Sequence, residues 1–228
     1  MFRSWLVLFV ASLSALAQSP PGNSIQASGS ATINGITPDR VQLSIGVVTS
    51  AKTAQDAASQ NATQANAMIA AIQQAIGANG AVQTIGYSLT PQYSGGMNNT
   101  PPTITGYTAT NAVQVTINGT ANLNLVGPVI DAANQSGANN ISGPTYSLQN
   151  SDPYQQQALT AAAKEALGHA GAIAAGLGAK AGAVISAQEG STVSPVVGVA
   201  AAGANATPIQ TGTVSVSATV TVTVALAQ

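Results

Sequence analysis

The chain has 228 residues, of which only 5% are charged: five Lys or Arg and six Asp or Glu, with one His and no Cys. An ordinary globular protein carries about 25% charged residues. Acid–base catalysis, nucleophilic catalysis and metal binding draw on carboxylates, histidines and thiolates, so the composition argues against an enzyme. We expect no catalytic residue, no metal site and no cofactor. The lack of a basic stripe also excludes nucleic acid as a partner.

The first residues have the features of a secretory signal peptide. Arg3 is followed by a short apolar run, 5–11, and by the small-residue sequence Ala15-Leu16-Ala17. This pattern predicts that residues 1–17 are removed and that the mature chain, 18–228, is periplasmic or secreted. A membrane anchor is the alternative, but the apolar run is shorter than the ~20 residues needed to span a bilayer. We expect no transmembrane span in the mature chain.

The charge of the mature chain is nearly balanced. Without Arg3 it has four basic and six acidic residues, a net charge of −2. A net charge near zero leaves little repulsion between copies and promotes association. We therefore expect a homo-oligomer.

The first third of the chain predicts two strands and a helix. Period-two alternation of apolar residues predicts strands over 25–33 and 41–47, with a turn at 35–39 between them. A helix is expected to begin at Thr53, whose side chain can cap the first amides, and to end at Gly77. Its spacing places on one face Ala54, Ala58, Ala62, Ala65, Met68, Ile69, Ile72 and Ile76.

A hairpin and a second helix–strand unit follow. The patterns predict strands over 85–93 and 107–117, a helix near 122–136 and a strand over 140–148. From 41 to 148 the order is strand, helix, strand, strand, helix, strand. This is the split βαβ order of ferredoxin-like folds.

The last part adds one helix and two strands to this core. Asp152 and Pro153 predict a helix start, and the aligned residues are Ala158, Ala162, Ala166, Ala170, Ile173 and Leu177. Strands are expected over 182–189 and 214–224, with a flexible segment at 190–211. The whole of 18–228 is thus one α+β domain. It has a split βαβ (ferredoxin-like) core at 41–148, helices packed on an antiparallel or mixed sheet, and an extra helix and terminal strands within 150–228.

Two groups of residues are candidate contact surfaces. Tyr87, Tyr93 and Tyr107 lie on the paired strands and can form an aromatic patch for a ligand, or can serve core or cross-strand packing. The second group is an uncharged apolar segment that contains Val196, Val197 and Val199. This segment is either an assembly contact or a free loop.

The remaining polar candidates have simpler interpretations. His169, with Glu165 one turn earlier, offers too few ligands for a zinc site, and a surface pair on the helix is the simplest interpretation. Asp39 and Arg40, after Pro38, form either an ion pair between subunits or an ordinary turn.

Several blocks of sequence together resemble a known family. They are Pro38-Asp39-Arg40, the alanine-rich helix from Thr53, Gln83–Tyr93, Ile104–Asn111, Gly137–Ile141, the helix around Ala158-Leu159 and the C-terminal Val/Thr strand. Over about residues 25–226 the chain resembles the SIMPL-domain family of mostly bacterial exported proteins. Far fewer charges than in typical members argue against a charge-mediated partner.

The resemblance implies an α+β fold and a periplasmic, secreted or outer-membrane-associated location. Some members are surface antigens that assemble into hollow rings, and others are linked to oxidative-stress defence; no catalytic residues are established. The implied function is that of a non-enzymatic exported envelope protein that acts through oligomeric assembly, in envelope or oxidative-stress protection. A periplasmic module that binds a small molecule or an envelope polymer is the alternative.

Overall fold

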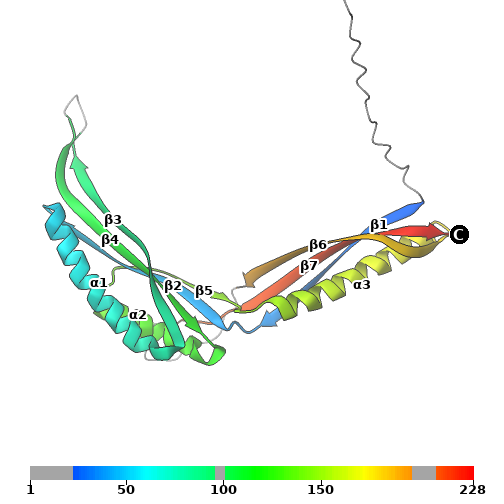
Figure 1. The fold of residues 1–228 in the computed structure, drawn as a ribbon, viewed down its shortest axis with the longest axis horizontal. Coiled ribbons are helices and arrows are strands. Elements are labelled where there is room, and N and C mark those ends of the chain that lie inside the picture. Colours follow the sequence, from blue (N-terminus) through cyan, green and yellow to red (C-terminus); the bar gives the residue numbers. More distant parts are fainter. Residues whose placement is uncertain (1–22, 96–100, 197–208) are drawn as a thin grey trace, which may run out of the picture.

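The computed structural model describes residues 23–95, 101–196 and 209–228, and these form two antiparallel sheets with helices on one face of each (Figure 1). The predicted signal peptide and residues 197 and 199 lie outside the described residues. The strands are β1 (Ser24–Ile36), β2 (Arg40–Ala51), β3 (Gly80–Ser94), β4 (Thr103–Asn118), β5 (Asn140–Ser147), β6 (Lys180–Val196) and β7 (Thr213–Ala227). The α-helices are α1 (Ala54–Ile76), α2 (Val126–Gln135) and α3 (Asp152–Gly176).

The larger sheet confirms the predicted split βαβ order. Its strands are ordered β3-β4-β2-β5, and every neighbouring pair is antiparallel. Each of α1 and α2 therefore joins two parallel strands that have a third strand between them. Both helices pack on the face formed by alternate apolar residues of β2 and β4, among them Val41, Leu43, Ile45, Val113 and Val115. The α+β fold class is thus as predicted.

The smaller sheet pairs the two ends of the domain. Its order is β1-β7-β6, with Ser24 opposite Ala225 at one end and Ile36 opposite Val214 at the other. The sequence predicts a simple turn between the first two strands, but β1 and β2 lie in different sheets. Both neighbours of β2 are already taken, by β4 and β5. Residues 37–39 are therefore the connection between the sheets.

Helix α3 covers the smaller sheet with a stripe of alanines. Ala158, Ala162, Ala166, Ala170 and Ala174 recur at every fourth position and are fully buried. The predicted continuation through Ile173 and Leu177 is wrong, because both side chains are exposed. Helix α3 lies close to the sheet because its inner side chains are small, and the larger side chains of Ile173 and Leu177 lie at its flank.

Helix α1 begins as predicted, but its buried face differs in the first turns. The Asp56 amide donates to Thr53 Oγ1 at 3.1 Å, as expected for the cap. The buried residues are Ala57, Asn61, Ala65, Met68, Ile72 and Ile76. The N-terminal half of the helix is thus turned so that Asn61, and not Ala58 or Ala62, faces the sheet.

The predicted flexible segment begins inside a strand. Residues 190–196 continue β6 and pair with β7 as far as Val196, which lies opposite Thr213. Beyond 208, Ile209 packs against the core of the larger sheet.

Candidate functional surface

The β3–β4 hairpin carries the largest exposed apolar side chains of the larger sheet. Alternation along β3 brings Tyr87, Leu89 and Tyr93 to one face, and the register places Ile104 of β4 opposite Tyr93 and Tyr107 opposite Pro91. The exposed fractions are 56% for Tyr87, 38% for Leu89, 60% for Tyr93 and 51% for Ile104. Tyr107 is half-buried. We call Tyr87, Leu89, Tyr93, Ile104 and Tyr107 the apolar arm surface.

Two features of the hairpin expose these side chains. Thr49 donates through Oγ1 to the Ala57 carbonyl oxygen in the first turn of α1, and it lies opposite the fully buried Ala109 of β4. The hairpin continues beyond this level to Ser94 and Thr103, past the start of α1 (Figure 1), so Tyr93 and Ile104 emerge into solvent. Leu89, opposite Ala109, and Tyr87, opposite Asn111, do not lie past the helix; they are exposed on β3, which is an edge strand.

The three tyrosines of the sequence analysis lie on paired strands of this hairpin, as expected. Tyr87 and Tyr93 are not core residues, since more than half of each side chain is exposed. Leu89 and Ile104 belong to the same surface but were not among the candidates. The alternation of apolar residues in both strands was the signal that could have identified them.

The other face of the arm is held by polar contacts. Gln92 Nε2 donates to Thr108 Oγ1 at 2.6 Å, and Thr108 Oγ1 lies 3.2 Å from Ser50 Oγ. These bonds connect the side chains of β3, β4 and β2 on the face away from α1. They stiffen the hairpin, so the apolar arm surface is presented on a preformed support.

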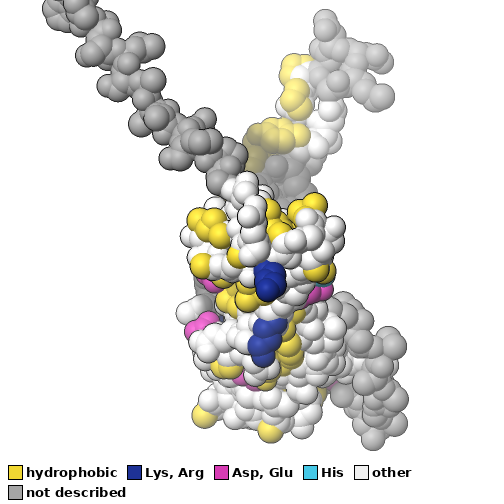
Figure 2. All heavy atoms as spheres, turned by 90° about the vertical axis from the view of Figure 1, so that its right-hand side faces the viewer, with side chains coloured by type: hydrophobic (Ala, Val, Ile, Leu, Met, Phe, Trp, Pro, Cys, Tyr) yellow, Lys and Arg dark blue, Asp and Glu magenta, His cyan; other side chains and the backbone are white. Residues whose placement is uncertain are grey.

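The arm lies in a long stretch without charge. From residue 57 to residue 130 the sequence contains no Asp, Glu, Lys, Arg or His. Figure 2 shows that neutral polar side chains and backbone also dominate the end of the molecule on the right of Figure 1. The nearest charge across the sheet is Lys52, which follows Ala51, the strand partner of Tyr107. Exposed apolar side chains on an uncharged hairpin are typical of an interaction surface.

Asp39 and Arg40 lie at the connection between the sheets. Asp39 Oδ1 accepts a hydrogen bond from the backbone amide of Gln149 at 2.6 Å, and the side-chain Nε2 of Gln149 donates to the Asp39 carbonyl oxygen at 3.1 Å. Arg40 Nε donates to Asn118 Oδ1 at 3.3 Å. The Asp39 contacts join the β1–β2 connection to the β5–α3 connection, and the Arg40 contact joins the start of β2 to the end of β4. Both residues therefore have structural partners within the chain.

Ser28, Glu165 and His169 come together where α3 meets β1, but not as a catalytic triad. His169 Nδ1 lies 2.8 Å from the Ser28 carbonyl oxygen, and Glu165 Oε2 accepts from the Ser30 amide at 2.6 Å. The Ser28 hydroxyl is instead 2.9 Å from Thr221 Oγ1 on the neighbouring strand. A triad needs the imidazole on the serine hydroxyl. Here both helix residues bind the backbone of β1, rather than forming the expected surface pair.

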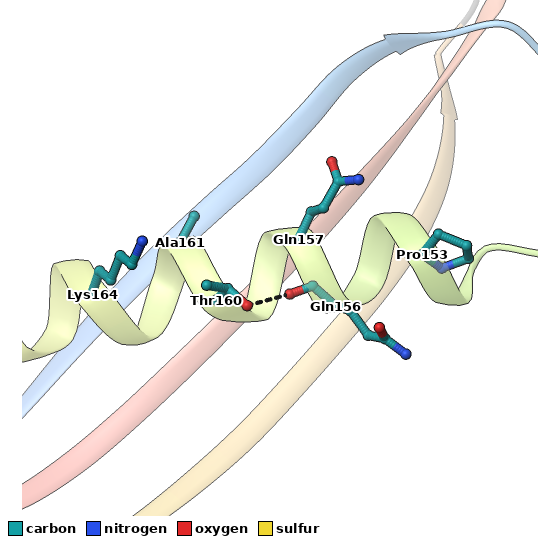
Figure 3. Close-up of a pocket in the computed structure, with 6 residues that line it drawn as sticks. All are labelled: Pro153, Gln156, Gln157, Thr160, Ala161 and Lys164. Carbon is teal, nitrogen blue, oxygen red and sulfur yellow. Dashed lines mark hydrogen bonds between the residues drawn. The ribbon is translucent and has the colours of Figure 1, made fainter.

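A shallow hollow of about 580 Å³ lies along α3 (Figure 3). It is lined by Pro153, Gln156, Gln157, Thr160, Ala161 and Lys164. The Thr160 hydroxyl donates to the Gln156 carbonyl oxygen at 2.8 Å. Because every lining residue comes from one helix, no second element encloses the hollow, and it lacks the converging polar groups of an active site.

Two other features are absent from the described residues. No group of three or more His, Cys, Asp or Glu side chains there could hold a metal ion. In the same residues, no helix combines the length and apolar character that a membrane crossing requires.

Comparison with protein families identifies the fold as that of a known group. The model of the SIMPL family, described as a protein of unknown function (DUF541), matches residues 25–224. No curated protein matches the chain. The family match spans both sheets and all three helices, and the chain therefore belongs to the SIMPL family.

Proposed function

We propose that this protein is a non-enzymatic, exported envelope protein that acts by assembling with copies of itself through the apolar arm surface. The observation that carries the proposal is the exposure of Tyr87, Tyr93 and Ile104 on an uncharged hairpin. Aromatic side chains are enriched at the centres of protein interfaces, where charged residues are depleted. A second copy brings an equally uncharged hairpin, so the contact has no like-charge repulsion.

Val196, Val197 and Val199 remain a second candidate contact within this proposal. Val196 ends β6, an edge strand of the smaller sheet. Edge strands have unpaired backbone groups that can bind another chain. If the hairpin of one copy contacts β6 of the next, the interface joins two different surfaces and gives head-to-tail assembly, whereas hairpin-to-hairpin contact gives a two-fold dimer.

The assembly proposal is tested by placing charge on the arm. Tyr87→Glu with Tyr93→Glu puts two carboxylates where the contact would exclude water, and burying an unpaired charge costs several kcal/mol. We expect sedimentation velocity to show oligomers for the mature wild-type chain and monomers for the double variant, with unchanged circular dichroism. The matched control is Gln156→Glu with Gln157→Glu on the outer side of α3, which should leave the oligomer intact. A monomeric wild type, or a double variant of wild-type mass, would refute the proposal.

Export is part of the proposal and has its own test. Ala15 and Ala17 are the small residues that a signal peptidase requires. N-terminal sequencing of the exported protein should find Gln18 first. Met1 on the exported protein would show that the segment is retained.

A protective role in the envelope follows from assembly rather than from redox chemistry. The chain has no cysteine, so it has no thiol to react with peroxide. We propose that any protection against oxidative stress comes from a physical layer of assembled copies. Deletion of the gene should then increase peroxide sensitivity, and the arm variant should fail to restore resistance although it is exported and folded.

The alternative is a module that binds a small molecule or an envelope polymer. It would use the exposed tyrosine rings of the arm to contact this ligand instead of a second copy. Exposed Tyr87 and Tyr93 could stack on a ligand. In that case the arm variant would lose ligand binding while the wild-type protein stayed monomeric in sedimentation.

A further inference from the structure

The face of the smaller sheet opposite α3 carries a regular array of hydroxyl groups. We call this array the hydroxyl face; its members are Ser28, Ser30, Thr32, Thr219, Thr221 and Thr223. They alternate with residues such as Ala27 and Val222, which are buried under α3. The three residues on β1 and Thr219 are exposed, while Thr221 and Thr223, on the central strand, are half-buried.

The hydroxyl groups are ordered before any ligand binds. Ser28 Oγ lies 2.9 Å from Thr221 Oγ1, and Thr32 Oγ1 lies 2.9 Å from Ser217 Oγ. A hydroxyl has one donor and two acceptor positions, so a bonded pair still has one donor and three acceptor positions free. Hydroxyls recur about 6.8 Å apart along each strand and about 4.8 Å apart between strands. The face is therefore a preorganised lattice of groups that both donate and accept.

The two strands that carry the hydroxyl face contribute neither a charge nor an aromatic side chain to it. On β6, Glu189 lies opposite Val220, which is buried on the α3 side. Lys180, the first residue of β6, lies opposite Ala227 and so on the same side as Thr223, at the end of the face. One cation at the end neutralises few phosphates, so nucleic acids and anionic polymers gain little from the face. Without aromatic anchors it also lacks what protein partners use, since Ser and Thr are under-represented among interface hot spots.

We infer that the hydroxyl face binds a neutral polysaccharide chain. Each sugar carries uncharged hydroxyls that donate and accept, which matches the chemistry of the hydroxyl face and requires no charge to be desolvated. A single such bond adds little, because it replaces bonds to water. A polymer that makes many of them along a strand gains affinity through multivalency. The inference is independent of the proposed assembly, because it uses the other sheet and applies equally to a monomer.

The test is affinity gel electrophoresis of the mature chain through neutral polysaccharides. We expect hydroxyethyl cellulose, laminarin or dextran in the gel to retard the protein. Carboxymethyl cellulose, which has the backbone of the first polymer but carries negative charge, should retard it less than hydroxyethyl cellulose does. The variant Thr219→Val/Thr221→Val/Thr223→Val keeps the shape and strand preference of threonine and removes the hydroxyls. It should weaken binding about tenfold or more, because each lost bond is a several-fold factor in affinity.

Two further variants locate the effect. The Thr→Ser triple variant at the same positions keeps the hydroxyls and should bind as the wild type does. The matched control is Thr110→Val/Thr116→Val on β4, in the other sheet, which should also leave binding unchanged. Melting curves confirm that each variant is folded. The inference is overturned if no neutral polymer retards the wild type, if the valine variant at 219, 221 and 223 binds normally, or if the β4 control loses binding equally.

Discussion

Gly29 of β1 lies directly against the backbone of Ala162 in α3. A Cβ atom built at position 29 would collide with the Ala162 carbonyl oxygen and the Ala166 amide nitrogen. Both are backbone atoms of a helix whose inner side is a row of buried alanines. The glycine has no side chain and the alanines have only a methyl group, so α3 and β1 are already close to their nearest possible approach.

The first prediction is that Gly29→Ala is strongly destabilising. The added methyl group can be accommodated only if the helix moves away, and overpacking of this kind costs about 1–3 kcal/mol. We expect the upper end of that range, because the obstructing atoms are backbone. Gly190→Ala in β6 is the control, since no atom lies within 4 Å of its Cβ position. Urea unfolding of both variants measures the difference; similar midpoints would show that α3 is not held against β1 as described.

A second prediction concerns Asn61, the buried polar residue of α1. Its Nδ2 donates to the carbonyl oxygens of Val47 at 2.9 Å and Ala109 at 3.0 Å, and so ties the helix to β2 and β4. Asn61→Asp removes the donor and places a carboxylate beside two carbonyl oxygens in a fully buried site. We expect a loss of about 3 kcal/mol or more in unfolding free energy near neutral pH.

Asn66→Asp is the matched control, because Asn66 lies on the same helix and is exposed. It should change stability by no more than about 0.5 kcal/mol. Chemical unfolding of the two variants separates burial from the change in charge. Equal effects would mean that the Asn61 side chain is not in the core.

Asn61 also shows why the sequence predicts α1 but not its orientation. The apolar spacing, the Thr53 cap and Gly77 are local signals, and they give the helix and its ends correctly. The first two turns, however, offer alanines on several faces and one asparagine. A buried asparagine is favourable only where carbonyl groups from other strands meet it, and the sequence does not show which strands those are. The predicted face therefore followed Ala58 and Ala62.

The pairing of β1 has a similar cause. Its alternation predicts a strand, but alternation does not identify the partner, and the nearest strand in sequence is β2. The choice of β7 depends on both edges of β2 being occupied, which is a property of the whole sheet. The arm was predictable only in part. Alternation placed Tyr87 and Tyr93 on one face of a strand but did not show that this face is exposed. The exposure of Tyr93 depends on where α1 begins relative to the hairpin, and that of Tyr87 on the position of β3 at the edge of the sheet.

A third prediction concerns Tyr146 of β5. Burial raises the pKa of its hydroxyl above the ordinary value of 10.0, and the nearby Thr211 side chain acts in the opposite direction. The hydroxyl oxygen is buried and forms no complete hydrogen bond among the described residues. Because the folded-state pKa is the higher one, the unfolded chain ionises first. This group therefore contributes stability that is present below about pH 10 and is lost as the pH rises through the folded-state pKa.

Tyr146→Phe should remove that part of the alkaline loss. At about pH 8 we expect the variant to be as stable as the wild type or slightly more stable, since an unpaired buried hydroxyl is costly. Between about pH 8 and pH 11 its unfolding free energy should fall less than that of the wild type. Parallel pH profiles would show that Tyr146 is not the group responsible, and a large loss at about pH 8 would show that its hydroxyl has a stabilising partner.

The last prediction concerns the outer edge of β1. Glu165 and His169 bind the Ser30 amide and the Ser28 carbonyl oxygen on an edge strand of the smaller sheet. Both contacts are exposed, so His169→Gln should change stability by no more than about 1 kcal/mol.

Glu165→Ala with His169→Ala, by contrast, leaves these backbone groups open. An open, uncharged edge is a template for pairing with another chain. We expect a small loss of stability but a clear increase in aggregation on gentle heating, followed by light scattering. Gln156→Ala with Thr160→Ala, at the same spacing on the outer side of α3, is the control and should aggregate like the wild type. If the Glu165/His169 variant also behaves like the wild type, these side chains do not protect the edge of β1.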